Sequence, residues 1–580
     1  MLSQIVVGVD FGTTYSGVSW AVRTKAAGQK VRVINDWPDP HALNSTSEKV
    51  PTTTSYTNDG KLARWGYANS PGEFTLKWFK ILLEPDNKYK NAVEEVYTSK
   101  KLLKAIKRSP EDLVADYLRL IWKYTKDDIC RHQGHDWKEI YGLKVVLTVP
   151  AIWSAVAKER TLRAARAAGL PNDITLVTEP EAAALAVLKD KAAEEGLHVG
   201  DSFVVCDAGG GTVDLISYRI KTLCPLQIEE SAIGNGDLCG SVFVDRAFER
   251  YIATIVGPEV YRTRFSEKAK ANMMREFEYG VKRVFTGDGG LYTVDLKGAG
   301  DDPKNGIDDD TITLKVSMLR TIFDHICNQV ETLVERQIDS VHEYGSEVKA
   351  VLLVGGFGSS KYLYNHISAA QRASGIRVLQ STNAWSAICR GATEWGLENV
   401  GSVVVHPGRT NKTIVSRLSR YSYGVALSCL WDSSIHDERD RYFDEAEGVH
   451  RARNQMRWLL RRGQQITDGE ELTLSLYETV QVGFWSSGQL NFTRCLYICG
   501  EDVPPRRRDS TVSKFCSVAY SIPCPELYME KSYRSKVNRK RYRDVTFKLV
   551  MKLGGAKVDF KVYYNDRLAA YCEATYLEDA

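Results

Sequence analysis

The chain has 580 residues, more than one hydrophobic core supports, so two or three domains are expected. With 43% hydrophobic and 26% charged residues, the composition excludes a disordered or collagen-like protein. The net charge of +4 is too small to indicate nucleic acid or acidic lipid as the main partner. No run of about 18 apolar residues could span a bilayer, and the start lacks the features of a secretory signal. We therefore expect a cytoplasmic protein without a membrane span.

The charge distribution indicates a domain boundary, and the cysteine content excludes a disulfide-stabilised fold. Residues 1–400 carry a net charge of −2 and residues 401–580 carry +6, which indicates a boundary near residue 400. Twelve cysteines are too sparse for a disulfide framework. Cys495 and Cys499 form a close pair, but no second pair completes a zinc site.

Two segments far apart in the chain resemble each other. Residues 5–19 read IVVGVDFGTTYSGVS, and residues 203–217 read FVVCDAGGGTVDLIS. Each has an apolar run, an aspartate, a Gly/Thr-rich turn and a second apolar run, which predicts a β-hairpin. Asp10 and Asp207 end the first strands of the two hairpins. This duplication predicts an α/β protein with two similar lobes that face each other across a cleft.

Helices and buried strands fill the rest of the first 400 residues. Apolar spacing predicts helices over 111–129, 155–168, 181–195 and 316–343, and the sequence LKVVLTVP at 143–150 predicts a buried strand. After residue 400 the pattern changes to period two, and residues 565–567 (NDR) indicate a hairpin turn. The C-terminal part is therefore predicted to be mainly β, in a sandwich-like arrangement.

The loops of the two hairpins indicate an anion site. Glycine lets the backbone approach a ligand closely, successive N–H groups bind anions, and threonine hydroxyls add donors. Asp10 and Asp207 are placed to hold the water shell of a Mg²⁺ ion that bridges phosphates. A third glycine turn, VGGFGSS at 354–360, follows a buried strand and opens a helix, as in many nucleotide sites. It lacks the GK[ST] of a P-loop.

Five motifs together resemble a known family. They are DFGTTYSGVSWA (10–21), LTVPAIW (147–153), VTEPEAAALAVL (177–188), CDAGGGTVDLISY (206–218) and LLVGGFGSSKYL (352–363). They resemble the nucleotide-site motifs of actin-like ATPases and, in order and spacing, those of the 70-kilodalton heat-shock chaperone family. The resemblance covers residues 1–397 strongly and is weaker beyond.

The resemblance implies an organisation and a cofactor. It implies a two-lobed actin-like nucleotide-binding domain at 1–398, with lobes of about 1–197 and 198–398. It also implies a linker at 399–412 and a β-rich substrate-binding domain at 413–580. The implied ligands are ATP or ADP with Mg²⁺.

Site residues follow from the same motifs. The implied catalytic residues are Asp10, Glu179, Asp207 and Thr212, and Asp10 and Asp207 are the implied Mg²⁺ residues, bound through water. The implied nucleotide-binding residues are Gly12, Thr13, Thr14, Tyr15, Gly209, Gly210, Gly211, Asp214, Glu278, Lys282, Arg283, Gly355, Gly356 and Ser359.

Departures from the family pattern bear on catalysis. The stretch WGYANSPGE (65–73) matches the segment that carries the family's catalytic lysine, but Asn69 stands near that position. Lys77 is a candidate substitute, although a solvated position is the favoured interpretation. Asn383-Ala384-Trp385 replaces an Asn-Pro-Asp. We therefore expect nucleotide binding with slow hydrolysis, which Asn69→Lys would accelerate.

The C-terminal part resembles the chaperone β-sandwich faintly, through 420–427, 458–466 and 472–478. This resemblance implies binding of unfolded or extended polypeptide, together with co-chaperones or exchange factors. Only four residues follow the last predicted strand, so no helical lid is expected. A basic cluster, KSYRSKVNRKRYR at 531–543, is interpreted as a solvated loop, with nucleic acid or anionic lipid as the lesser alternative.

Several function classes remain open at this stage. The leading hypothesis is a chaperone-like protein that couples a slow ATPase to peptide binding. The alternative is a nucleotide-dependent scaffold or sensor with little or no hydrolysis. A sugar kinase on the same superfold is disfavoured by the sequences of the motifs, and a filament-forming protein is disfavoured by the large β part.

Overall fold

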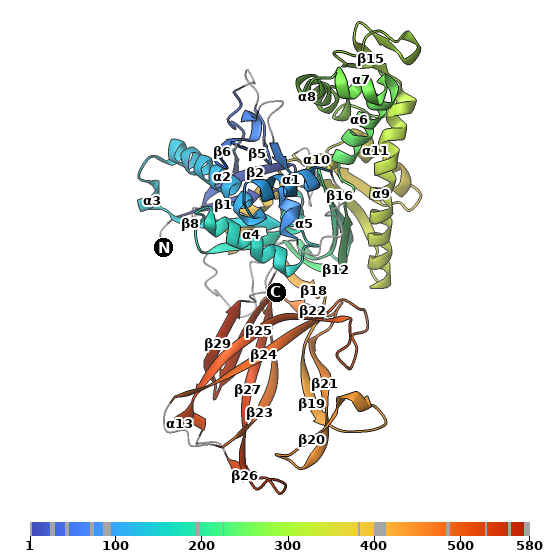
Figure 1. Ribbon diagram of the computed structural model, residues 1–580. Helices are drawn as coiled ribbons and strands as arrows, with labels where there is room; N and C mark the ends of the chain where they lie inside the picture. The colour runs from blue at the N-terminus through green and yellow to red at the C-terminus, as the bar shows by residue number, and fades with distance from the viewer. Residues whose placement is uncertain are drawn as a thin grey trace. The chain divides into compact units, whose positions relative to one another are not determined.

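The structure is a computed structural model (Figure 1). It describes residues 3–23, 30–40, 46–57, 59–69, 75–84, 94–191, 197–223, 226–380, 383–399, 413–482, 488–527, 531–554 and 558–573. The chain divides into two compact units, Met1–Thr413 and Ile414–Ala580. Almost all of the predicted linker, 399–412, lies outside the described residues.

The first sheet of the N-terminal unit is built around the first hairpin. Its strand order is β3-β2-β1-β8-β9, and β4 pairs with β2. The bounds are β1 (Gln4–Asp10), β2 (Tyr15–Arg23), β3 (Arg32–Val33), β4 (Val50–Pro51), β8 (Gly142–Val149) and β9 (Ile174–Thr178). β1 pairs antiparallel with β2 and parallel with β8. All residues of β1 after Gln4 are buried, because helices cover this sheet.

The second sheet repeats this plan. Its order is β17-β16-β10-β11-β12, with bounds β10 (Ser202–Ala208), β11 (Val213–Leu223), β12 (Leu226–Asp237), β16 (Val348–Val354) and β17 (Arg377–Gln380). β10 pairs antiparallel with β11 and parallel with β16, as β1 does with β2 and β8. The internal duplication predicted from the two hairpins is therefore present in the sheet topology.

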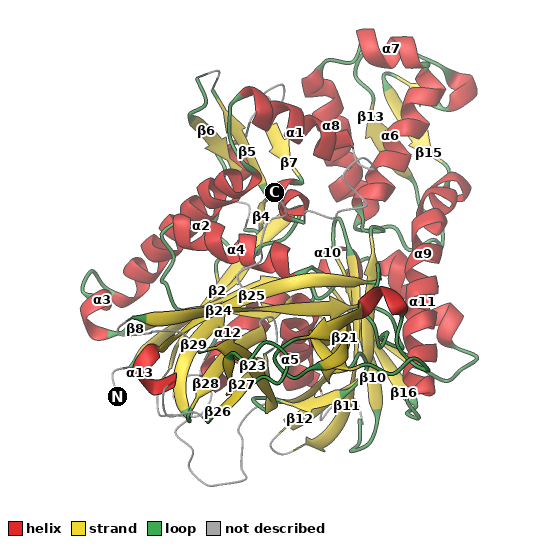
Figure 2. Cartoon of the chain, turned by 60° about the horizontal axis from the view of Figure 1, so that its bottom comes forward, coloured by secondary structure: helices red, strands yellow, loops and turns green. Residues whose placement is uncertain are grey.

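Helices surround both sheets (Figure 2). The four predicted helices correspond to α2 (Pro110–Gln133), α4 (Ala155–Ala167), α5 (Glu179–Lys191) and α9 (Val316–Glu343). The last helix of the unit, α12 (Ala387–Asn399), packs against β1, β2, β8 and α5. A Cβ on Gly391 of α12 would lie 1.7 Å from the Ala182 carbonyl oxygen of α5, so glycine permits this close approach. The lobe boundary at 197/198 thus leaves out α12, which packs on the first sheet although its sequence follows the second.

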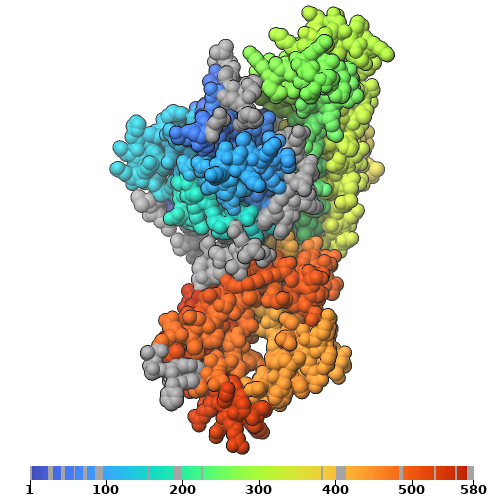
Figure 3. Space-filling view, in the orientation of Figure 1, coloured from blue at the N-terminus to red at the C-terminus, as the bar shows by residue number. Residues whose placement is uncertain are grey.

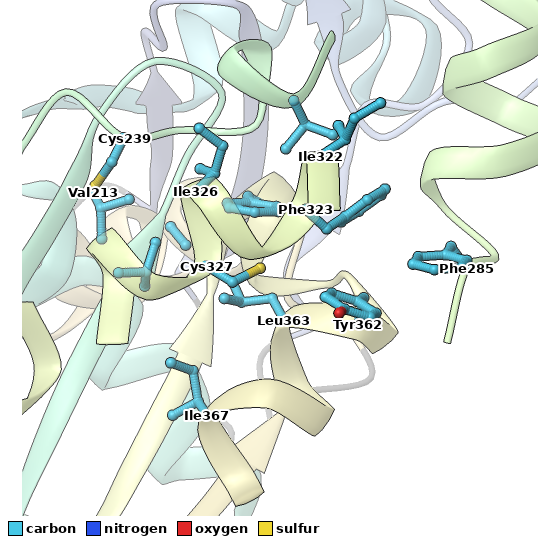
Figure 4. Packing of buried hydrophobic residues seen from close by; sticks show 14 of the residues in the cluster. Val213, Cys239, Phe285, Ile322, Phe323, Ile326, Cys327, Tyr362, Leu363 and Ile367 are labelled. Atoms are coloured by element: carbon cyan, nitrogen blue, oxygen red, sulfur yellow. The ribbon is translucent and has the colours of Figure 1, made fainter. Parts of the chain in front are cut away.

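An aromatic cluster forms part of the core of the second lobe (Figure 4). Phe285 stacks on Tyr362 with ring centroids 4.9 Å apart, and Phe323 lies 5.0 Å from Phe285. This core holds the chain two residues after Arg283, and so it fixes the segment that carries three predicted site residues.

The outer parts of the N-terminal unit are smaller elements. Two three-stranded sheets have the orders β6-β5-β7 and β13-β15-β14. Their strands are β5 (Thr53–Tyr56), β6 (Leu62–Trp65), β7 (Thr75–Lys77), β13 (Tyr292–Asp295), β14 (Ile307–Asp308) and β15 (Thr311–Leu314). The remaining helices are α1 (Glu94–Ala105), α3 (Trp137–Ile140), α6 (Val242–Val256), α7 (Pro258–Thr263), α8 (Glu267–Glu276), α10 (Gly355–Gly358) and α11 (Lys361–Gln371), with single-turn helices η1 (Gly66–Ala68), η2 (Phe79–Leu83) and η4 (Pro303–Asn305) and a π-helical turn η3 (Phe277–Lys282).

The C-terminal unit is mainly β, as the period-two pattern predicted. One sheet has the order β20-β21-β19-β24-β25 and the other β23-β27-β28-β29, with β26 paired to β27; β18 pairs with β22. The bounds are β18 (Ile414–Leu418), β19 (Ser422–Leu430), β20 (Arg441–Asp444), β21 (Val449–Leu460), β22 (Gln465–Thr467), β23 (Glu471–Gln481), β24 (Gln489–Cys499), β25 (Val512–Pro523), β26 (Ser532–Arg534), β27 (Arg541–Leu553), β28 (Val558–Tyr564) and β29 (Arg567–Glu573), with short helices η5 (Glu438–Asp440) and α13 (Cys524–Leu527).

The two sheets of this unit pack face to face. Tyr520 of β25 lies 5.1 Å from Phe547 of β27, and Phe515 lies 6.1 Å from Phe560 of β28, measured between ring centroids. Asn565 and Asp566 adopt positive φ in the predicted hairpin turn between β28 and β29. Across the described residues of both units, no helix is long and apolar enough to cross a membrane.

Candidate functional site

A pocket in the N-terminal unit gathers most of the predicted site residues. It is lined by Asp10, Gly12, Thr13, Thr14, Tyr15, Glu179, Asp207, Gly209, Gly210, Gly211, Thr212, Glu278, Lys282, Arg283, Gly355, Gly356 and Ser359. Residues not predicted from the sequence also line it: Lys49, Lys80, Ser241, Val242, Asp245, Phe357, Ser360, Trp385 and Ile388. Asp214 is buried on β11 opposite Asp207 and is not among the lining residues.

The first glycine loop is held from behind. Thr52 donates its backbone N–H to the Thr14 carbonyl (2.8 Å) and its hydroxyl to the Gly12 carbonyl (2.8 Å). A Cβ on Gly12 would lie 2.1 Å from the Tyr15 carbonyl oxygen, so only glycine fits this turn. With these carbonyls already hydrogen-bonded, the loop offers mainly donors to a ligand.

The second loop is held in the same way by a different segment. The N–H groups of Gly240, Ser241 and Val242 donate to the carbonyls of residues 211, 209 and 210, at 3.2, 3.2 and 3.0 Å. The two loops touch, because a Cβ on Gly210 would lie 2.0 Å from the Thr14 hydroxyl oxygen. The duplicated hairpins therefore present two anion-binding turns to one space.

Asp10 is paired with a lysine that sequence reasoning missed. Lys49 Nζ lies 2.6 Å from Asp10 Oδ2, and both side chains are buried. Burial alone would lower the pKa of Lys49, but the adjacent Asp10 carboxylate outweighs burial and raises it. No pattern in the surrounding sequence, STSEKVPTT, marks this lysine, because its role depends on a contact 39 residues away.

A second buried lysine pairs with the predicted catalytic carboxylate. Lys80 of η2 is 1% exposed, and its Nζ lies 2.5 Å from Glu179 Oε1. Its ammonium also lies over the rings of Phe11 and Trp153, 5.6 and 5.3 Å from their centroids. Burial raises the pKa of Glu179 to about 7, although the Lys80 charge opposes that rise.

The pocket therefore contains two buried lysines, Lys49 and Lys80, at positions other than the two that the family pattern suggested. Asn69 donates to Thr53 Oγ1 and to the Gly66 carbonyl and does not line the pocket. Lys77 is exposed, in agreement with its favoured interpretation as a solvated residue. The sequence did carry a signal for Lys80. The apolar run WFKILL is expected to be buried, and a lysine buried with it needs a charged partner.

Trp78 connects the segment before η2 to the second lobe. Its backbone is left-handed, with φ 62° and ψ 15°, although it is not a glycine. Its ring is buried, packs edge-on against Phe243 at 6.2 Å and lies under the Arg246 guanidinium at 5.6 Å. This conformation turns the chain so that Lys80 points into the pocket.

Asp207 differs from Asp10. Its Oδ1 atom is buried and has no hydrogen-bond partner among the described residues. Burial and the neighbouring carboxylates of Glu179 and Asp214 raise its pKa well above the ordinary value. The Lys49 charge offsets this rise only in part, so a cation bound at Asp207 would remove the remaining cost.

The far end of the pocket carries charged and aromatic groups. Lys282 lies between Asp245 (2.7 Å) and Glu278, both of which it pairs with. Burial raises the pKa of Asp245 to about 6, against the effect of Lys282. The Arg283 guanidinium lies 5.0 Å from the Trp385 ring centroid and 4.4 Å from that of Tyr279. Tyr15 packs edge-on to Trp385 at 5.7 Å.

These features define a class of protein. Two duplicated α/β lobes, facing glycine loops and a bipartite pocket with phosphate-type and aromatic ends are consistent with the actin-like ATPase fold. The profile of the family described as Hsp70 protein matches residues 107–393, and a domain of unknown function (DUF8568) matches residues 417–578.

Curated relatives point to the same family. The chain is 23% identical to human heat shock 70 kDa protein 12B over 68% of each chain. It is 25% identical to human heat shock 70 kDa protein 12A over 72% of this chain and 73% of that one. It is 29% identical to an HscA chaperone homologue of Acinetobacter baumannii over 38% of this chain and 33% of the other. Together these matches support a divergent member of the Hsp70 family.

The basic cluster 531–543 is more ordered than a free loop. β26 pairs with the start of β27, and Tyr533 stacks on Tyr542 with ring centroids 6.2 Å apart. Residues 535–540 form the connecting loop, so the cluster is a β-hairpin with mostly exposed basic side chains.

Proposed function

We propose that the N-terminal unit binds ATP and ADP with Mg²⁺ and hydrolyses ATP. The observation that carries this proposal is the meeting of two glycine loops, from duplicated hairpins, at one pocket with buried carboxylates and lysines. Phosphates would lie against the loops, and the Arg283–Trp385 end would hold the base by stacking.

The residues present fit a divalent ion. Asp207 supplies a buried oxygen without a hydrogen-bond partner in the described part of the chain. Within the described part of the chain, no group of three or more His, Cys, Asp and Glu side chains is placed to hold a metal ion. A hard ion such as Mg²⁺ suits this donor set, since it takes one or two carboxylates and completes its shell with phosphate oxygens and water. The bound ion supplies charge neutralisation at the phosphates.

Lys80 and Glu179 supply the groups that hydrolysis requires. A carboxylate whose pKa is about 7 can accept a proton from the attacking water near neutral pH. The Lys80 ammonium, in a water-poor site, stabilises negative charge that develops on the transferred phosphoryl group. Lys80 would then take the role that the family pattern gives to a lysine near Asn69, and we propose that hydrolysis does not depend on Asn69 or Lys77.

Calorimetry with Mg-ATP and Mg-ADP on the full chain tests binding, and single-turnover kinetics test hydrolysis. Asp207→Lys would place a fixed cation at the metal position and is expected to remove Mg²⁺-dependent binding. An exposed lysine elsewhere, Lys77→Ala, serves as the control. Absence of heat and of a thermal shift at millimolar nucleotide would contradict the proposal.

For the C-terminal unit we propose binding of extended apolar polypeptide along β23. This 11-residue strand pairs with β27 over its whole length without a bulge, and the described strands show no partner on its other edge. It carries no Lys, Arg or Pro, and its two glutamates, Glu471 and Glu478, are engaged in ion pairs with Lys561 and Arg494. Leu472, Leu474 and Val480 on its inner face are partly exposed. Figure 3 shows an opening through this unit, between the yellow-orange residues of β19–β21 and the redder strands.

Such an edge binds a peptide as an additional strand. Main-chain hydrogen bonds supply affinity, and alternate side chains of the peptide meet the apolar inner face. The HscA homologue among the relatives is named a chaperone, which supports the same class of ligand. Because binding through one edge is not enclosed, we expect fast release, and nucleotide and peptide should alter each other's affinity by the same factor if the units are coupled.

Two lysine substitutions on neighbouring residues test the edge. Leu474→Lys places a charge on the inner face, whereas Thr473→Lys places the same charge on the exposed face. Fluorescence anisotropy of a labelled extended apolar peptide should show about tenfold or greater weakening for the first and less than about threefold for the second. Equal effects, or no peptide binding by the wild type, would contradict the proposal.

A nucleotide-dependent scaffold with little hydrolysis is the second candidate function. The ion pair between Lys49 and Asp10 favours it, because that carboxylate is already engaged. Single-turnover hydrolysis that stays at the uncatalysed rate, with tight nucleotide binding, would select this candidate.

A further inference from the structure

The carboxylates that line the pocket are not equally neutralised. Its lining includes five carboxylates: Asp10, Glu179, Asp207, Asp245 and Glu278. Four of them form ion pairs, with Lys49, Lys80 or Lys282. For Asp207 the described residues include no ion-pair partner, and its Oδ1 accepts no hydrogen bond.

Lys49 is built into the site. Its carbonyl oxygen accepts hydrogen bonds from the Ser47 hydroxyl (2.8 Å) and the Tyr67 hydroxyl (3.0 Å), which fix its backbone. Its side chain passes over Gly17 of β2, where a Cβ would lie 3.1 Å from Lys49 Cγ. Its ammonium ends at Asp10, next to the first glycine loop, and lines the pocket. Contacts with β1, β2 and η1 thus hold Lys49 so that its positive charge lies beside the loop.

We propose that Lys49 is a built-in cation of the phosphate site and that the divalent ion is held by Asp207 alone. This rests on the proposed nucleotide binding. The ammonium, held by Asp10, neutralises phosphate oxygens on the side of the first loop. A divalent ion that also used Asp10 would have to displace Lys49 from a buried ion pair and would be repelled by its charge. The protein therefore retains nucleotide without a divalent ion better than a site with two free aspartates would.

The first test measures the affinity for ADP of the full chain by calorimetry, in Mg²⁺ and in EDTA. We expect the wild type to lose less than about tenfold in EDTA. Lys49→Met should lose about 30-fold or more in EDTA, since a buried contact to a charged group is removed, and should recover most of that affinity in Mg²⁺ because Asp10 becomes free for the ion. Lys144→Met, which removes a lysine paired with Asp173 outside the pocket, is the control.

The second test locates the ion by electron paramagnetic resonance of Mn²⁺ in the presence of ADP. Asp207→Asn should weaken Mn²⁺ binding by about tenfold or more, and Asp10→Asn by less than about threefold. In the Lys49→Met background, Asp10→Asn should weaken Mn²⁺ clearly. If Lys49→Met fails to fold, Asp10→Asn/Lys49→Met removes both charges and should show the same loss of ADP affinity in EDTA.

The outcomes separate the two proposals. Wild-type ADP binding that needs Mg²⁺ as strictly as Lys49→Met does, or equal Mn²⁺ losses for Asp10→Asn and Asp207→Asn, would overturn the role of Lys49 and leave nucleotide binding intact. No ADP binding by the wild type under any condition would overturn the proposed function itself, and the role of Lys49 with it.

Discussion

The two hairpins of the N-terminal unit share a backbone plan and differ in their charges. β1–β2 and β10–β11 are both antiparallel hairpins, and the first strand of each also pairs with a parallel strand, β8 or β16. Each first strand ends at or just after an aspartate. Asp10 is neutralised by Lys49, whereas Asp207 has a buried oxygen without a hydrogen-bond partner in the described chain. The duplicated hairpins therefore determine the positions of the two loops. The segments that follow each hairpin determine whether its aspartate is neutralised.

The largest expected effect is on ATP turnover, and it should distinguish Lys80 from Lys282. Lys80→Ala should lower ATP turnover by about 10²–10³-fold while the affinity for ATP changes little, because the charge it stabilises develops in the transition state. Lys282→Ala should instead weaken ATP binding, since Lys282 lies at the far end of the pocket between Asp245 and Glu278. Steady-state kcat and KM of both variants check this division. A KM effect for Lys80 and a kcat effect for Lys282 would reverse it.

The glycines of the two loops should fail in different ways. Gly12→Ala forces a Cβ onto the Tyr15 carbonyl within its own turn and should cost about 2–3 kcal/mol of unfolding free energy. Gly210→Ala meets the Thr14 side chain of the opposite loop, so it should weaken nucleotide binding with a smaller loss of stability. Urea unfolding and calorimetry on the same samples test both. Similar stability losses would show that both glycines serve only their own turns.

Glu179 should give the ATPase a pH dependence. Its pKa of about 7 lies above the ordinary 4.5, so the carboxylate that accepts a proton forms only as pH rises through about 7. Turnover should therefore rise about tenfold between pH 6 and pH 8 and then level. Glu179→Gln should turn over ATP more slowly and should not show this rise between pH 6 and pH 8. A flat profile for the wild type would assign proton transfer to another group.

The smallest effect is expected at Asn69. Asn69→Lys should leave ATP turnover within about twofold, because this side chain holds Thr53 and Gly66 and does not line the pocket. It should cost about 1 kcal/mol in unfolding free energy through the lost hydrogen bonds. A clear acceleration would restore the original expectation for this position.

The sequence predicted the parts of the fold that depend on local pattern. The hairpin duplication, the long helices α2 and α9 and the β character after residue 413 all follow from periodicity and turn residues. It also placed both glycine loops and their aspartates on one cleft, because strand ends and glycine turns are local features.

What it missed depends on contacts between distant segments. Lys49 and Lys80 reach Asp10 and Glu179 across 39 and 99 residues, and nothing local fixes such pairs. The packing of α12 on the first sheet similarly depends on the close fit of Gly391 to Ala182. The family pattern pointed to Asn69, whereas Lys80, eleven residues further along the chain, is the residue that reaches Glu179.

The backbone of Trp78 links the conformation of the Lys80 segment to a contact between the two lobes. A left-handed conformation costs a non-glycine residue about 1–2 kcal/mol, and here it is held by packing of the ring on Phe243 and Arg246 of the opposite lobe. If the lobes separate, these contacts would break, the Trp78 backbone would be free to relax, and Lys80 would move away from Glu179. Opening of the cleft and loss of the ion pair at Glu179 would then occur together.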